Sequence, residues 1–288
     1  MIYELSNGII TAKINTLGAE LISVCRGDAE YIWNGDKKWW DDKAPVLFPI
    51  CGRLPEKKYS YGGRVYDMDI HGFGWKSEFA IKSADAQRLV LELCESEETL
   101  KQYPFAFSFT ADFSIESDEL TLKFTVKNRD EKVLPYMVGW HPGFNLFGDS
   151  PINTFSLKFN GGEVLSHHAI LPGCFVAEDG EDYPAKDSTY VLNEEEIYSQ
   201  DTMIFTKTGG SALLSSPNTD KKLLMEYSEN LPYFCIWKET SAEARFVCLE
   251  PWSDIPTVGI APVSFEDRKM SRLASGKEKD YTYKVKFF

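Results

Sequence analysis

The chain has 288 residues, of which 43% are hydrophobic and 26% are charged, and its formal net charge at pH 7 is −13. This length and composition predict a folded protein with a sizeable core and are not typical of intrinsic disorder. Because an acidic chain without a long basic cluster lacks the positive surface that meets phosphate, we expect neither nucleic acid nor an anionic membrane as a partner, and a neutral small molecule is favoured.

The cysteines and the first residues indicate a compartment. Six cysteines, none in a C-x-x-C pattern, lie at positions 25, 51, 94, 174, 235 and 248, several of them inside apolar runs. This usage favours buried free thiols in a reducing environment. The opening Met1-Ile2-Tyr3-Glu4 has no signal-peptide character, and no run approaches the length of a transmembrane helix. We therefore expect a cytoplasmic protein.

Period-two alternation of apolar and polar residues is the dominant pattern, and it predicts strands with one buried face. In chain order, the alternation is found at Ile10–Ile14, Phe105–Ser114, Leu120–Lys127, Phe155–Phe159 and Tyr281–Phe287. The polar segment Glu116–Glu119 joins the second and third runs, so these two are expected to form a hairpin.

Helical signals are few and short. Ser96–Thr99 is expected to cap one or two turns before Tyr103-Pro104, and Asn193–Glu196 places carboxylates in a first helical turn, where the helix dipole favours them. No βαβ rhythm, phosphate-binding glycine loop, repeat or linker is found. These patterns predict an all-β, mainly antiparallel sandwich with few short helices, formed by residues 1–288 as a single domain.

Two of the four histidines lie in segments rich in glycine and aromatic residues: His71 in Ile70–Trp75 and His141 in Gly139–Asn145. Such surroundings fit either a histidine that faces a ligand or a packed, hydrogen-bonded turn histidine. His167-His168 follow two glycines and are expected in a surface loop. Because no H-x-x-x-H, C-x-x-C or H-E-x-x-H spacing is present, we predict neither a metal nor a cofactor.

Two charged residues lie at the ends of apolar runs. Glu250, in Phe246–Trp252, is either a strand-end glutamate that faces water or a partly buried carboxylate with the raised pKa of a general base. Arg53 ends the apolar, proline-bounded run Pro45–Leu54. It is a candidate to donate hydrogen bonds to sugar oxygens or to form a structural salt bridge.

Taken together, these segments resemble the aldose 1-epimerase family, and most of all its LacX-like branch. The match runs nearly end to end in the family's order, through Asn15–Leu21, Leu47–Leu54, His71–Phe73, the strand pair near Tyr103–Asn128, Trp140–Phe144, Asp201–Phe205, Phe234–Trp237 and Leu249–Trp252. The resemblance implies a β-supersandwich of the galactose mutarotase type, with a sugar cleft open on one sheet.

The resemblance also implies roles. Glu250 matches the general base and His141 the general acid of a cofactor-independent enzyme that interconverts the α and β anomers of a hexose. His71, Arg53 and Asp201 match substrate-binding positions. For the acid role, His141 is expected to be protonated in the resting state, with a neighbouring carboxylate raising its pKa. Candidates to stack on the sugar ring, each with core packing as the alternative, are Trp140, Phe144, Trp237 and Trp252.

Two departures bear on the preferred sugar. Gly52 stands where better-characterised members have Asn, and Gly74-Trp75 stands where they often have Ala-Arg. A hexose-6-phosphate 1-epimerase, with Arg64 and Lys76 near the cleft, and a non-catalytic sugar-binding protein are alternative functions. A glycosidase is a weaker one, because it usually requires two carboxylates across the scissile bond.

Overall fold

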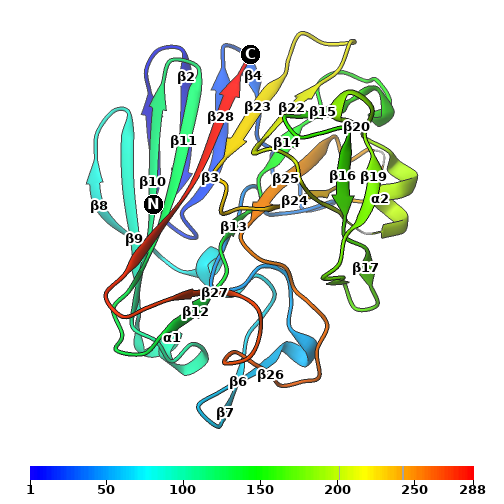
Figure 1. Ribbon diagram of the computed structural model, residues 1–288. Coiled ribbons are helices and arrows are strands. Elements are labelled where there is room, and N and C mark those ends of the chain that lie inside the picture. The colour runs from blue at the N-terminus through cyan, green and yellow to red at the C-terminus, as the bar shows by residue number, and fades with distance from the viewer. Residues whose placement is uncertain (201, 242) are drawn as a thin grey trace.

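The computed structural model describes residues 1–200, 202–241 and 243–288, and its framework is two large antiparallel sheets (Figure 1). In this part of the chain the first sheet has nine strands, in the spatial order β20 (Thr189–Val191), β15 (Ser156–Phe159), β22 (Ser211–Ser215), β23 (Leu223–Tyr227), β28 (Glu278–Phe287), β11 (Glu119–Asn128), β10 (Phe107–Glu116), β9 (Arg88–Cys94) and β8 (Ala80–Ala84). The predicted antiparallel β-sandwich is confirmed.

The second sheet has eight strands among the described residues. Its order is β19 (Glu181–Pro184), β16 (Val164–His167), β21 (Met203–Thr206), β24 (Tyr233–Trp237), β25 (Phe246–Trp252), β13 (Gly139–Trp140) and β5 (Val46–Leu47), with β14 (Gly143–Asn145) also paired to β25. This sheet carries the site described below, because β25 and the β13–β14 connection contain the Leu249–Trp252 and Trp140–Phe144 segments.

Smaller elements complete the fold. They are the sheet β1 (Ile2–Ser6), β2 (Ile10–Asn15), β3 (Glu20–Arg26) and β4 (Ala29–Glu30); the sheet β26 (Val263–Ser264), β6 (Lys58–Tyr61) and β7 (Arg64–Asp67); the pairs β12 (Leu134–Tyr136) with β27 (Ser271–Leu273) and β17 (Ile170–Leu171) with β18 (Phe175–Val176); and short 3₁₀ turns at Pro55–Lys57, Gly74–Lys76, Ile152–Thr154 and Lys186–Ser188. None of the described helices is long and apolar enough to cross a bilayer.

Both predicted helices are present, as α1 (Glu97–Gln102) and α2 (Glu194–Gln200). Ser96 begins α1 as expected, because its side chain accepts a hydrogen bond from the Thr99 backbone N–H at 3.2 Å.

The predicted hairpin is β10–β11, which pairs in register from Phe107 opposite Asn128 to Glu116 opposite Glu119. The alternation works as expected, because the apolar side chains of both strands face the second sheet. Phe109 of β10 stacks on Phe48 after β5 with ring centroids 4.5 Å apart, and Tyr283 of β28 lies 5.6 Å from Trp140 of β13. The core therefore lies between the two large sheets.

Strand β25 departs from simple alternation, because all seven of its residues are buried. Val247 and Leu249 point into the main core, whereas Phe246 and Cys248 belong to a separate cluster on the other face. That cluster is covered by tryptophans: Trp33, Trp39, Trp40 and Trp237. Glu250 is two residues beyond Cys248, so its side chain leaves the strand on this covered outer face.

Truncation of Phe109 tests the inter-sheet core. Phe109 is fully buried, so we expect Phe109→Ala to lower the free energy of unfolding by about 3–5 kcal/mol, the usual cost of a large cavity. The matched control is Thr110→Ser, one residue along the strand on the other face, with an expected change within about 0.5 kcal/mol. Urea denaturation followed by circular dichroism measures both, and equal effects would contradict this description of the core.

Candidate functional site

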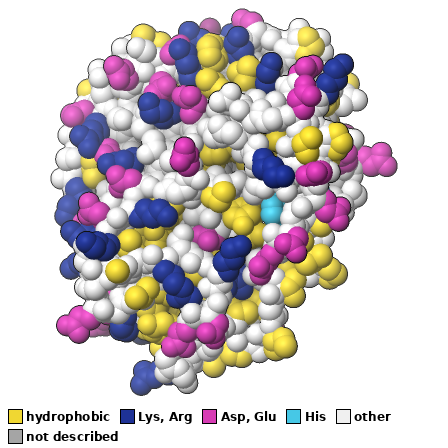
Figure 2. Space-filling view, in the orientation of Figure 1, with side chains coloured by type: hydrophobic (Ala, Val, Ile, Leu, Met, Phe, Trp, Pro, Cys, Tyr) yellow, Lys and Arg dark blue, Asp and Glu magenta, His cyan; other side chains and the backbone are white. Residues whose placement is uncertain are grey.

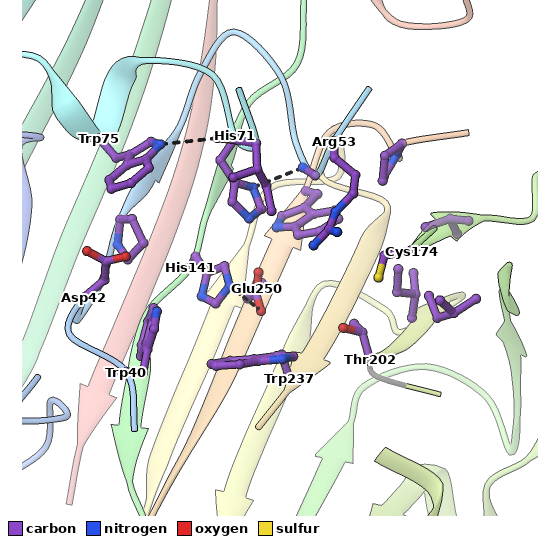
Figure 3. A pocket seen from close by; sticks show the side chains of 18 residues that line it. Trp40, Asp42, Arg53, His71, Trp75, His141, Cys174, Thr202, Trp237 and Glu250 are labelled. Carbon is purple, nitrogen blue, oxygen red and sulfur yellow. Dashed lines mark hydrogen bonds and ion pairs between the residues drawn. The ribbon is translucent and has the colours of Figure 1, made fainter. Parts of the chain in front are cut away.

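A pocket of about 300 Å³ opens on the outer face of the eight-stranded sheet (Figure 3). It brings together five of the six site residues that the sequence predicts: Arg53, His71, His141, Trp237 and Glu250. They come from segments far apart in the chain. The sixth, Asp201, lies outside the described residues, so its role stays a prediction.

At the floor of the pocket His141 meets Glu250, with 3.3 Å between Nε2 and Oε1 (Figure 3). Backbone hydrogen bonds fix the loop that carries His141. Its own N–H donates to the Pro45 carbonyl at 3.0 Å, and the Leu249 N–H donates to the Pro142 carbonyl at 3.3 Å. Glu250 is 1% exposed. In the described part of the chain, Glu250 Oε2 and His141 Nδ1 are buried and have no hydrogen-bond partner.

Burial controls the protonation of this pair. It raises the pKa of Glu250 well above its usual range, with the nearby Trp252 indole opposing the rise, and it lowers the pKa of His141 to about 4. The expectation that a neighbouring carboxylate keeps His141 protonated in the resting state is therefore wrong. Burial therefore favours the uncharged form of each group, a protonated Glu250 beside a neutral His141, because desolvation opposes both ionic forms.

His71 presents one donor to the pocket. It has a left-handed backbone, with φ of 59°, and its Nδ1 accepts a hydrogen bond from the Gly52 N–H at 3.0 Å. Burial, together with the electrostatic effect of nearby Arg53 and His141, lowers the pKa of His71 well below its usual range. The ring is therefore neutral, and because Nδ1 is the acceptor, Nε2 carries the proton.

Arg53 is exposed at the pocket wall and has no ion pair within the described residues. The structural salt bridge considered as its alternative role is therefore not found there. Of the two other cations considered for phosphate, Arg64 is on β7 and does not line the pocket, and Lys76 pairs with Asp69 at 3.0 Å. Figure 2 shows Lys and Arg interspersed with Asp and Glu over one face of the molecule, rather than gathered in a basic patch.

Aromatic rings form much of the pocket surface. Trp237 and Trp252 line it, whereas Trp140 and Phe144 are fully buried in the main core, so only the first two remain stacking candidates. Trp40 also lines the pocket, with its ring centroid 5.1 Å from that of His141.

Sequence reasoning missed Trp40 and Asp42, and it treated Trp75 only as a departure from the family pattern. All three lie together along one side of the pocket (Figure 3). The available signal was weak: Trp39-Trp40-Asp41-Asp42 places aromatic and acidic residues side by side in a segment without strand periodicity. Such a run marks a candidate loop for ligand binding, but it does not show which side chain faces the ligand.

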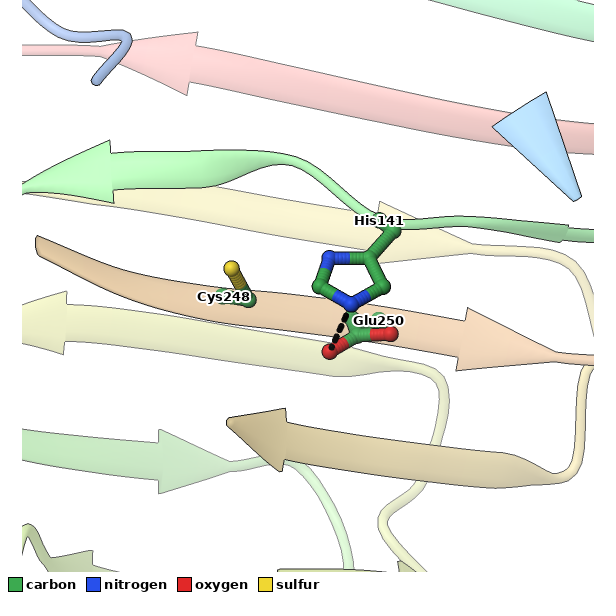
Figure 4. A group of neighbouring side chains, drawn as sticks. All are labelled: His141, Cys248 and Glu250. Carbon is green, nitrogen blue, oxygen red and sulfur yellow. Dashed lines mark ion pairs between the residues drawn. The ribbon is translucent and has the colours of Figure 1, made fainter. Parts of the chain in front are cut away.

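One group of described residues has the composition of a metal site. His141, Cys248 and Glu250 offer nitrogen, sulfur and oxygen ligands within 4.8 Å of one another (Figure 4). Zn²⁺ accepts such a set, but its thiol ligand must be deprotonated. Burial raises the pKa of Cys248 well above its usual range, and Nε2 of His141 already faces Glu250 directly. Without a metal ion, the Cys248 thiol is therefore protonated.

The expectation that His167-His168 lie in a surface loop is wrong. His167 ends β16, and His168 is buried, with Nδ1 3.0 Å from the Ala177 carbonyl oxygen and Nε2 3.2 Å from Thr206 Oγ1. Neither histidine lines the pocket. The glycines before them form a turn, after which the chain returns into the sheet.

The chain as a whole is similar to known proteins. A model of the family described as aldose 1-epimerase matches residues 1–285. The chain is 28% identical over 271 residues to protein LacX of Lactococcus lactis subsp. lactis, a match that covers 89% of each. It is also similar to two solved structures. One is a galactose mutarotase related enzyme from Lactobacillus acidophilus (TM-score 0.92, 28% identity, 100% of this chain and 97% of that chain), and the other is a galactose mutarotase-like protein from Lactobacillus casei ATCC 334 (TM-score 0.94, 27% identity, 100% of both).

The departure at Gly52 has a local explanation. Its φ of 70° is in the left-handed region, and a Cβ added there would lie 2.4 Å from Cγ of Pro256. Pro256 therefore occupies the space that a side chain at position 52 would need. Because Gly52 also holds Nδ1 of His71, this backbone position controls how the imidazole is presented.

A double-mutant cycle tests this packing. We expect Gly52→Ala to lower the free energy of unfolding by about 1–3 kcal/mol, from backbone strain together with overpacking. In a Pro256→Gly background the overpacking against Pro256 is removed. Gly52→Ala should then lower the free energy of unfolding only by the backbone strain, about 1 kcal/mol. Chemical denaturation of the four proteins gives the coupling. An identical cost in both backgrounds would show that Pro256 is not the constraint.

Proposed function

This chain belongs to the aldose 1-epimerase family, and we propose that it interconverts the α and β anomers of a hexose by acid–base opening and closure of the ring. The observation that carries the proposal is the buried contact between His141 and Glu250 at the floor of a pocket of about 300 Å³. A pocket of this size suits a small ligand, and the His141–Glu250 pair faces it.

The reaction needs a pair that holds one proton. In ring opening, the C1 hydroxyl gives its proton to a base while the C1–O5 bond breaks and O5 takes a proton from an acid. The pair thus holds one proton before and after the step, and closure on the other face of the carbonyl reverses the transfers. Opposed pKa shifts in Glu250 and His141 maintain this count around neutral pH.

We propose that Glu250 is the base and His141 the acid once sugar is bound. Glu250 lines the pocket, and a sugar hydroxyl that donates a hydrogen bond to its carboxyl group would stabilise the carboxylate. The displaced proton then moves across the 3.3 Å contact to His141. Substrate binding therefore converts the neutral pair into a Glu250 carboxylate and a His141 imidazolium, which are the base and the acid that ring opening needs.

The other pocket residues have supporting roles in this proposal. His71 donates from Nε2, and Arg53 donates from the pocket wall, to oxygens that gain negative charge as the ring opens. Trp237 offers a flat apolar surface for the C–H face of the sugar, next to His141 at 5.7 Å between ring centroids.

We further propose that residues 1–288 act as a single domain in the cytoplasm. The position of β28 supports the first part. This strand is close to the end of the chain, yet it lies between β23 and β11 near the middle of the nine-stranded sheet.

Removal of the base tests the activity and the assignment together. We expect the wild type to accelerate the relaxation of freshly dissolved α-D-glucose or α-D-galactose in a polarimeter. Glu250→Gln should reduce this acceleration by about 10²–10⁴-fold, because the amide cannot take the proton. The matched control, Glu226→Gln at an exposed position of β23, should match the wild type. Full acceleration by Glu250→Gln would exclude Glu250 as the base.

The pH profile tests the one-proton pair. Below the pKa of His141, about 4, the pair holds two protons and has no base; above the raised pKa of Glu250 it holds none and has no acid. We therefore expect kcat/KM, after subtraction of the uncatalysed rate, to fall towards pH 4 on the acid side and above the raised pKa of Glu250 on the alkaline side, with a plateau between them. Circular dichroism at each pH controls for unfolding. A fall centred near pH 6.5 would show that His141 titrates as an ordinary histidine.

A further inference from the structure

The two sides of the pocket differ in charge. Arg53 lies on one side of the His141–Glu250 pair, and Asp42 lies on the other, beside Trp75 and Trp40 (Figure 3). The side chain of Asp42 is half-buried and has no hydrogen bond or ion pair in the part of the chain that the structure describes. It is a carboxylate that faces the pocket and lacks a partner.

The surroundings of Asp42 favour a neutral or cationic ligand. Lys76, whose charge acts on Asp42, is held by Asp69 at 3.0 Å and lies 4.2 Å from the centre of the Trp75 ring. Burial and the nearby charges of Glu20 and Asp41 raise the pKa of Asp42 to about 6. At neutral pH this carboxylate is still mostly ionised, and its charge is not neutralised by the protein.

One turn near the start of the chain positions this side of the pocket. Glu20 Oε1 accepts hydrogen bonds from the Lys43 and Ala44 N–H groups, at 2.8 and 3.1 Å, and so fixes the backbone directly after Asp42. In the same turn, a Cβ on Gly18 would lie 2.5 Å from the carbonyl oxygen of Trp75, so the two backbones pack closely. The carboxylate and the indole are thus held in place before any ligand arrives.

We propose that Asp42 binds substrate hydroxyls and, with Trp75, forms a wall that selects a sugar without negative charge on that side of the ring. A carboxylate accepts hydrogen bonds from two neighbouring hydroxyls, whereas it repels a phosphate or carboxylate group. The inference rests on the proposed function for the nature of the ligand. It deepens that function by naming Asp42 and Trp75 as residues that determine specificity.

The test measures dissociation constants, so it does not depend on turnover. Tryptophan fluorescence, with Trp40, Trp75 and Trp237 in the pocket, or calorimetry reports the binding of D-glucose, D-galactose and their 6-phosphates. Asp42→Ala should weaken binding of the free sugars about 10–100-fold, the usual effect of losing hydrogen bonds to a charged group. Asp41→Ala, at an exposed neighbour that does not line the pocket, is the matched control and should bind like the wild type.

A second arm isolates the charge. The wild type and Asp41→Asn should bind the free hexose more tightly than its 6-phosphate, and Asp42→Asn should reduce or reverse this preference. Equal sugar binding by Asp42→Ala and Asp41→Ala would overturn the inference, as would an unchanged preference in Asp42→Asn or a wild type that binds no free hexose.

The outcomes separate this inference from the proposed function. If sugar binding depends on Asp42 but the protein has no mutarotation activity, the proposed function is rejected and the inference about Asp42 is kept. If mutarotation is lost in Glu250→Gln but sugar binding does not change when Asp42 is substituted, the proposed function is kept and the inference about Asp42 is rejected.

Discussion

The site depends on one constraint: a carboxylate that is 1% exposed lies against an imidazole at the floor of the pocket. Such a contact is stable only where the surrounding protein holds both groups in position. Strand β25 provides this, because it is covered on both faces, by the main core on one side and by the tryptophan cluster on the other. The eight-stranded sheet is therefore more than a platform for Glu250. Its outer aromatic layer produces the dry environment that shifts the pKa of the pair.

The same principle explains why several motifs near the pocket are built from glycine. Glycine at position 143 allows the Trp40 ring to pack against the backbone beside His141, since a Cβ there would lie 2.8 Å from Cζ3 of Trp40. Gly52 leaves room for Pro256 and at the same time anchors His71. Close contact between backbone and ring removes water from around the pair and fixes the direction of each donor.

The sequence could predict the features that depend on local pattern. Alternation predicted β10 and β11 because each of these strands has one face on the core, and Ser96 predicted α1 because a cap is a local hydrogen bond. The glycine-rich segments around His71 and His141 pointed to the pocket, although only the family resemblance assigned their roles. Asp42 was not predicted as a site residue, because nothing in its own segment distinguishes it from the exposed Asp41 next to it. Its orientation is determined by Glu20 and Gly18, whose contacts with residues 43, 44 and 75 follow from the tertiary fold.

The protonation state of the His141–Glu250 pair could not be predicted from the sequence for a related reason. Local reasoning placed a positive His141 next to a negative Glu250, which is the arrangement expected when water or other dipoles solvate both charges. Burial reverses this order, because an uncharged acid and an uncharged imidazole cost less in a dry site than two ions do. In the function proposed above, a sugar hydroxyl that donates to Glu250 shifts this balance towards the ionic forms. The protein without ligand would then avoid the cost of a buried ion pair, and part of the binding energy of the sugar would be used to create the charges that open its ring.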